Sequence, residues 1–178
     1  MAALTGGDKL EKVLAEIAAN ASGSLKVGFL AGATYADGTS VAQVAFWNEF
    51  GHGGRFPSPP RPYFRTMVSE QSPGWAVRLG KALTYYDMDA QKALSAMGEV
   101  ISDELRESII NLNAPELSPT TLVLRQRFWT NPQDIRFSDV LAAQQDAASG
   151  AEGAGGTQAK PLVWTGHMLN SIDYEVDP

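Results

Sequence analysis

The chain has 178 residues, a formal net charge of −6 and no cysteine. This length suits one domain with one hydrophobic core, and the missing cysteines exclude disulfides, thiolate nucleophiles and thiolate metal ligands. The acidic balance disfavours tight binding to nucleic acid, because such a chain gains little from releasing phosphate counterions. Because no basic and apolar leader or long apolar run is visible, we expect no signal peptide and no membrane partner.

In the first third of the chain, apolar periodicity predicts two helices and one strand. Residues 8–20 repeat apolar side chains at the spacing of one helical face. Residues 24–30 alternate as a strand does. Residues 41–50 predict a short apolar helix, which ends at Gly51.

A stiff loop, residues 52–60, follows this short helix. It holds two glycines and three prolines, so it cannot form regular structure. Beyond the loop, residues 63–70 and 75–83 predict two helices. A break is expected around Pro73, because proline removes a backbone donor and disrupts a helix.

The clearest pattern is the long amphipathic helix predicted for residues 89–112. Apolar residues recur there every three or four positions, while most charged residues lie off this stripe. Two shorter helices are expected beyond it. The first covers residues 120–128 with Ser118 and Pro119 at its start, and the second covers residues 138–148.

The last fifty or so residues combine an expected insertion with a closing strand. Residues 129–159 read as a flexible insertion within a single domain spanning residues 1–178, because residues 150–159 contain no bulky apolar side chain to offset the entropy of ordering. A helical turn at residues 165–170 leads into residues 171–176, which alternate as a strand.

These elements indicate an α+β fold. We expect a small, mainly antiparallel sheet packed against one long amphipathic helix and shorter helices, with a flexible insertion near the C-terminal end. The first and last strands are expected to pair. Because two strands alone are marginally stable, a third and a fourth strand are expected near residues 33–40 and 54–60, or from a neighbouring molecule.

The sequence offers no motif for catalysis or for binding a metal or cofactor. The two histidines, His52 and His167, lack the spacing of a paired metal site. No serine lies in a G-x-S-x-G turn, and the glycine-rich run lacks the lysine of a phosphate-binding loop. We therefore expect no catalytic, cofactor or metal residues, while a serine triad assembled only in space stays open.

Aromatic and arginine side chains around the stiff loop are the candidate structural residues. Three aromatic residues at helical spacing favour a core role over a platform for stacked bases: Phe46, Trp47 and Phe50. Arg61 and Arg65 are expected to cap a loop or to pair with carboxylates such as Glu49 rather than to contact DNA. Trp129 has few apolar neighbours along the chain, which favours a place in a protein interface.

Three segments occur together in a specific order. VAQVAFWNEFG at residues 41–51 is followed by PPRPYFR at residues 59–65, then LSPTTLVLR at residues 117–125 and PLVWTGHMLNSI at residues 161–172. In this order they resemble the virion-morphogenesis proteins of tailed bacteriophages, which are small neck or tail-completion proteins. The resemblance spans about residues 24–176. That family is not known for catalytic residues, so the resemblance implies none here.

The resemblance implies a non-enzymatic structural protein of the phage head–tail junction, assembled in the host cytoplasm and located in the virion. The implied partners are further copies in a ring of six or twelve, connector or portal-side proteins, tail terminator or tail tube proteins, and genomic DNA that passes through the lumen without sequence-specific binding. A tail terminator or minor tail protein is the alternative, and a phage-encoded hydrolase is a further one. The candidate structural and interface residues are Trp47, Glu49, Phe50, Arg61, Pro62, Phe64, Arg65 and Trp129.

The segment after the stiff loop predicts a preorganised edge. Pro62 fixes the backbone where the loop re-enters the fold, and we expect Tyr63 and Phe64 to anchor that end in the core. Such an edge loses little entropy on docking. This property suits the heterologous contacts that close a ring.

Overall fold

The computed structural model describes residues 23–54 and 57–177, and the helix expected for residues 8–20 lies outside them. The helices and strands are β1 (Ser24–Phe29), α2 (Val41–Phe50), α3 (Tyr63–Tyr85), α4 (Ala90–Asn111), α5 (Pro119–Arg127), α6 (Phe137–Ala148), α7 (His167–Asn170) and β2 (Ile172–Asp177). Two short 3-10 turns cover Pro132–Asp134 and Gly156–Ala159. The α+β fold with a long helix is confirmed. Within the described ranges, no helix is long and apolar enough to cross a membrane.

The first and last strands pair, as expected. β1 and β2 are antiparallel, with Ser24 opposite Asp177 and Phe29 opposite Ile172. The third and fourth strands expected near residues 33–40 and 54–60 are absent from the described part of these segments, which forms only isolated bridges. Prolines near the second bridge lack the donors that a longer ladder needs. Strands supplied by a neighbouring molecule stay a prediction.

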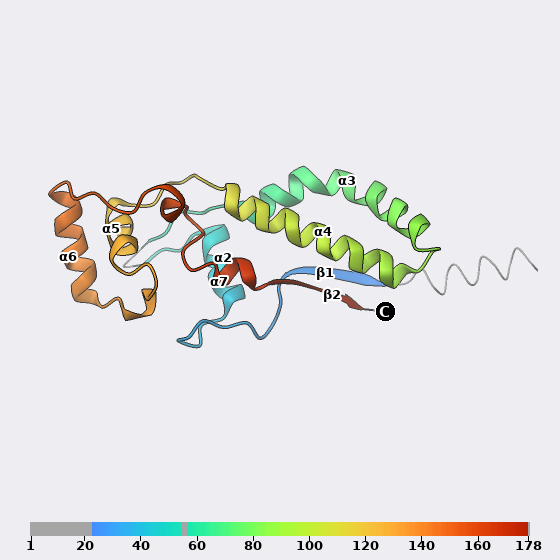
Figure 1. Ribbon diagram of the computed structural model, residues 1–178, viewed down its shortest axis with the longest axis horizontal. Coiled ribbons are helices and arrows are strands. Elements are labelled where there is room, and N and C mark those ends of the chain that lie inside the picture. Colours follow the sequence, from blue (N-terminus) through green and yellow to red (C-terminus); the bar gives the residue numbers. More distant parts are fainter. Residues whose placement is uncertain (1–22, 55–56, 178) are drawn as a thin grey trace, which may run out of the picture.

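Helix α4 is the centre of the fold and stabilises the narrow sheet. It lies between α3 and the two strands (Figure 1). Its buried stripe includes the fully buried Leu105 and Ile109, as the amphipathic pattern predicts. The helix begins where expected, because the Asp89 carboxylate accepts a hydrogen bond from the backbone of Lys92 at 3.0 Å.

The break expected near Pro73 is wrong, since α3 continues through this residue from Tyr63 to Tyr85. Contacts with α4 on both sides of the proline explain the continuity. Met67 is buried on one side, and on the other Trp75 donates from Nε1 to Glu104 at 2.9 Å. These tertiary contacts offset the one helical hydrogen bond that proline removes.

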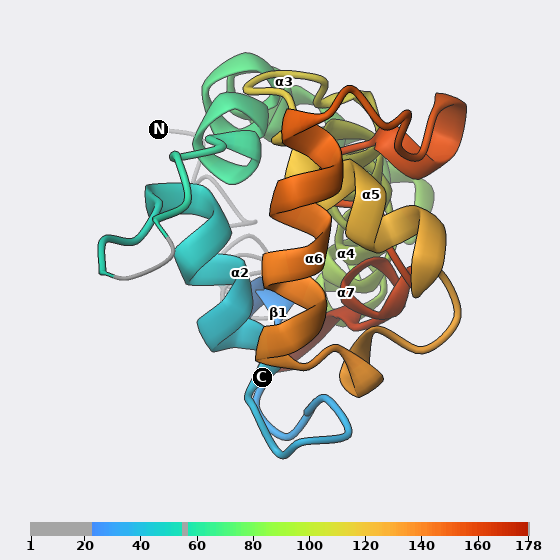
Figure 2. The ribbon, with the colours of Figure 1, turned by 90° about the vertical axis from the view of Figure 1, so that its left-hand side faces the viewer.

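Helices α5 and α6 form a hairpin at one end of the molecule (Figure 1), and Figure 2 shows α6 crossing this end face. The hairpin has its own small core, which includes Val123, Leu124 and Ala143. Ser118 caps α5, accepting a hydrogen bond from the backbone of Thr121 at 3.2 Å. Both expected helices are therefore present.

The glycine-rich segment after α6 makes more contacts than its composition indicates. Ala154 is buried and donates from its backbone to the carbonyl of Leu122 at 2.9 Å. A side chain at Gly153 would collide with Leu122, so glycine permits this approach. The segment lies against α5, and its mobility in the free protein stays a prediction.

A pair of alanine substitutions tests the packing of α4 against β2. The ring of Tyr174 leaves no room for a Cβ at Gly98, whereas nothing lies within 4 Å of a Cβ at Gly80 on α3. Gly98→Ala should lower the free energy of unfolding, because overpacking costs about 1–3 kcal/mol against a gain in helix propensity of about 1 kcal/mol. Gly80→Ala should raise it by up to about 1 kcal/mol. Urea unfolding followed by circular dichroism measures both, and a stabilised Gly98→Ala variant would contradict the packing described here.

Candidate functional site

Glu49 is a buried carboxylate at the junction of α2 and α3. The residue is 4% exposed. Its Oε2 accepts a hydrogen bond from the backbone of Phe64 at 2.9 Å, and its Oε1 accepts one from the backbone of Arg65 at 3.2 Å. These donors belong to the first turn of α3, where N–H groups have no partner within the helix. Glu49 therefore caps α3 from a neighbouring helix, with its negative charge at the positive end of the helix dipole.

Arg65 closes the same junction from the solvent side. Its Nε donates to Oε1 of Glu49 at 2.7 Å, so the expected pairing of an arginine with this carboxylate is observed. Its guanidinium carbon lies 4.9 Å from the centroid of the Phe50 ring, within range of a cation–π contact. One arginine thus links the capping carboxylate to an exposed aromatic side chain.

Arg61 fastens the stiff loop to the body. It is 5% exposed, and burial lowers the pKa of its guanidinium. Its Nε donates to the carbonyl of Pro115 at 3.3 Å, and its Nη1 donates to the hydroxyl of Ser58 at 3.1 Å. The loop-capping role expected for an arginine here falls to Arg61.

Tyr63 and Gly51 complete the junction. The Tyr63 hydroxyl donates to the carbonyl of Ala45 at 3.0 Å, and burial, with a contribution from the charge of Glu49, raises the pKa of Tyr63. The phenol therefore stays protonated and keeps its hydrogen bond. Gly51 has a φ of 74° and lies against the backbone of the loop, where a side chain would collide with Ser58.

Three aromatic residues of α2 form what we call the aromatic face: Phe46, Trp47 and Phe50. The core role expected for them is wrong, because they are 58%, 39% and 50% exposed. The buried side of α2 is instead occupied by Val41, Ala45 and Glu49. Within the face, the Phe46 and Phe50 rings have centroids 4.7 Å apart.

The remaining candidate residues have mixed positions. Pro62 is the N-cap of α3, and Phe64 is half-buried against the main core. Trp129 comes from another element, the bend after α5, and is half-buried. The structure thus gathers seven of the eight candidates around the junction of α2 and α3, and Trp129 is the exception.

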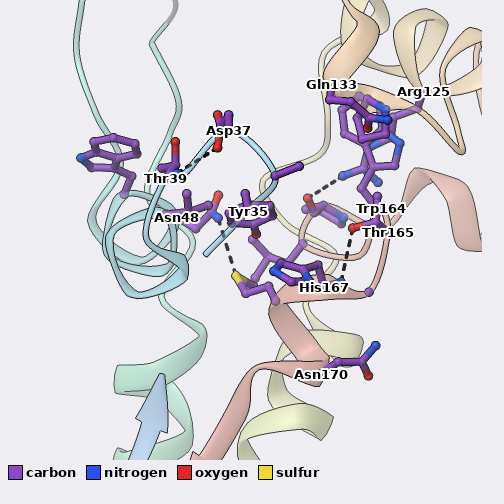
Figure 3. A pocket seen from close by; sticks show the side chains of 18 residues that line it. Tyr35, Asp37, Thr39, Asn48, Arg125, Gln133, Trp164, Thr165, His167 and Asn170 are labelled. Atoms are coloured by element: carbon purple, nitrogen blue, oxygen red, sulfur yellow. Dashed lines mark hydrogen bonds between the residues drawn. The ribbon is translucent and has the colours of Figure 1, made fainter. Parts of the chain in front are cut away.

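A groove of about 890 Å³ opens beside α2 and shares Trp47 with the aromatic face. Its walls come from the loop after β1, from α2 and from the segment around α7 (Figure 3). His167 contacts the carbonyl of Thr34 through Nε2 at 3.0 Å, and its ring centroid is 4.8 Å from that of Tyr35. In residues 23–54 and 57–177, no three acidic or histidine side chains gather to hold a metal ion.

Arg125, at one end of this groove, is a buried charge that sequence reasoning missed. It is 3% exposed and its guanidinium carbon lies 5.1 Å from the centroid of the Trp164 ring. Its Nη atoms donate to four backbone carbonyls at 2.5–3.1 Å, those of Gln158, Lys160, Pro161 and Val163. Burial lowers the pKa of Arg125 to about 10, so the group remains charged at neutral pH. An arginine directly after two apolar residues of α5 was the available signal.

Two buried charged groups, Glu49 and Arg125, thus join segments that are separated in the sequence. No family model, curated protein or solved structure matches this chain. Its function is therefore inferred from these residues and their geometry.

Removing the cap should destabilise the fold more than removing its ion-pair partner. Glu49→Ala leaves two helix N–H groups without their acceptor, at an expected cost of about 1–3 kcal/mol. Arg65→Ala should cost about 1 kcal/mol or less, because its side chain is 55% exposed. Urea unfolding of both variants measures the difference, and equal losses would rule out capping as the main role of Glu49.

Neighbouring arginines of α5 offer a second matched comparison. Arg125→Met leaves buried carbonyls unpaired and should lower the free energy of unfolding by about 3 kcal/mol or more. Arg127→Met removes only a partly exposed ion pair with Asp146, for which we expect about 1 kcal/mol or less. Arg125→Lys should recover little stability, since the single nitrogen of an ammonium cannot take the positions of both Nη atoms of the planar guanidinium. Thermal and urea unfolding measure all three, and wild-type stability of Arg125→Met would contradict this assignment.

Proposed function

We propose that this chain is a structural protein of the head–tail junction of a tailed bacteriophage, a neck or tail-completion protein that forms a ring around the DNA channel. The observation that carries the proposal is the aromatic face on a rigidly held helix. Exposed aromatic residues beside an arginine are typical of protein interfaces. Here Phe50 and Trp47 flank the buried Glu49, and Arg65 lies against the Phe50 ring.

Rigidity supports a docking role for this face. The Glu49 cap and the hydrogen bond from Tyr63 to Ala45 fix α2 against α3. A surface that is already ordered loses little conformational entropy when it binds. A ring repeats one contact many times, so it benefits from a contact surface with one fixed geometry.

The three segments that carry the family resemblance also have physical roles that support the proposal. The first segment supplies the Glu49 carboxylate and also Arg65, which lies beyond the stiff loop and donates hydrogen bonds to that carboxylate. The second supplies Arg125, and the third supplies the carbonyls of Pro161 and Val163 that it binds. Residues far apart in the sequence are thus contact partners, which gives a reason for their occurring together.

In the proposed ring, the partners are further copies of the chain, the connector or portal-side proteins, and the tail terminator or tail tube. The net charge of −6 suits a lumen that does not grip passing DNA, because like charges keep the duplex mobile. A tail terminator or minor tail protein would use the same kind of ring. Immunogold labelling separates these roles, since a neck protein marks joined particles and a tail protein also marks tails without heads.

Association of the purified full chain tests the aromatic face. We expect concentration-dependent oligomers by sedimentation velocity and rings by electron microscopy. Trp47→Ala combined with Phe50→Ala should weaken association by at least about tenfold, as loss of aromatic hot spots does. The matched control is Tyr85→Ala, since Tyr85 is 80% exposed at the far end of α3 and should leave association unchanged.

Two results would contradict this proposal. One is a wild-type chain that stays monomeric at every concentration and is missing from purified particles. The other is a double variant that keeps its melting temperature and still assembles like the wild type.

A further inference from the structure

A second hollow, of about 440 Å³, lies between β1, α3 and α4. We call it the α3–β1 groove. Every residue that lines it is apolar, and the walls include Val27, Val68, Trp75, Leu79 and Leu94. All five are only half-buried. Apolar walls of this kind are stabilised when another apolar surface covers them.

We propose that residues 8–20 of the same chain cover the α3–β1 groove as an amphipathic helix. This inference is independent of the proposed ring, because it concerns how one copy of the chain completes its own core. Three observations lead to it: the place where the segment joins β1, its length, and its pattern of apolar residues.

The segment joins the described chain at the edge of the groove. Gly23 directly precedes β1, and a Cβ added to Gly23 would lie 2.8 Å from Cδ1 of Leu94. Leu94 is itself a wall of the groove. Only Ala21 and Ser22 separate residue 20 from Gly23, so the segment can turn back over the groove within one tight turn. Such a short link gives the segment a high effective concentration at the groove of its own copy.

The lengths of the segment and of the strand beside the groove also match. β1 has six residues and spans about 20 Å at roughly 3.3 Å per residue. Residues 8 to 20 would form a helix of about 20 Å at roughly 1.5 Å per residue. A helix that runs antiparallel to β1 would therefore extend along the whole strand.

The residue pattern of the segment complements the groove. Leu10, Val13, Leu14 and Ile17 fall on one helical face, whereas Lys12 and Glu16 lie off it. A helix this short is marginal in water on its own. Covering apolar walls gives it the tertiary contact that it needs, and its charged side remains in solvent.

A disulfide test is well suited to this chain because it contains no cysteine. In the antiparallel arrangement, Ile17 lies toward the end of the groove that holds Leu79. We expect Ile17→Cys combined with Leu79→Cys to form a disulfide within the monomer under mild oxidation. The control pair, Glu16→Cys with Leu79→Cys, places its first thiol on the charged side and should react at least about tenfold more slowly. Non-reducing gels and peptide mass spectrometry identify the product.

A second measurement does not depend on the engineered thiols. Leu14→Asp should uncover the groove and raise the fluorescence of 8-anilinonaphthalene-1-sulfonate severalfold above the wild-type value. Lys12→Asp, a charge change on the other side of the segment, should leave the fluorescence unchanged. Circular dichroism verifies that both variants are folded.

The outcomes decide the proposal in either direction. A disulfide within the monomer from the Ile17 pair, together with dye binding only in Leu14→Asp, supports it. Disulfide-linked dimers alone would place the segment on another copy and overturn it. Equal reaction of the two cysteine pairs, or equal dye binding by the two aspartate variants, would overturn it as well.

Discussion

The fold and its candidate docking surface both depend on one buried carboxylate, that of Glu49. A carboxylate removed from water is stable only when hydrogen bonds replace its hydration. The first turn of α3 and the side chain of Arg65 provide these bonds. Because Glu49 lies between Trp47 and Phe50 in α2, the bonds that satisfy its charge also fix the direction in which the aromatic face points. Stability and the geometry of the surface therefore cannot vary separately at this position.

Arg125 is a buried positive charge, and it is stabilised by different groups from those that stabilise the negative charge of Glu49. Its buried positive charge is surrounded by backbone carbonyls and by the Trp164 ring, and these dipoles offset the cost of desolvation. Backbone carbonyls can accept hydrogen bonds from one buried guanidinium only if the segment that carries them is held in one conformation. The buried arginine thus binds the end of the glycine-rich segment and the turn before α7, where Leu162 also packs in the main core.

Local signals in the sequence predict the local features of this fold. The stripe of α4, the position where α4 begins, the Ser118 cap and the two strands follow from neighbouring residues alone. The continuity of α3 and the buried side of α2 depend instead on tertiary contacts. α3 continues through Pro73 because α4 holds both sides, and no periodicity could reveal those contacts. α2 is apolar around much of its circumference, so its pattern did not show which side is buried. Glu49 would indicate the wrong side, because acidic side chains are usually exposed unless they are paired, and its partners belong to another helix.

The aromatic face and the α3–β1 groove differ in the occupant that each suits. The aromatic face carries Arg65 at its edge, and its Phe46 and Phe50 rings pack on each other, a combination of aromatic and arginine side chains that suits a protein partner. The α3–β1 groove has walls of apolar side chains alone and lies directly against the central helix. Exposure of such a groove weakens the core itself, and a segment of the same chain can cover it before any partner is met. Covering the groove from within would therefore protect the core and leave the aromatic face exposed.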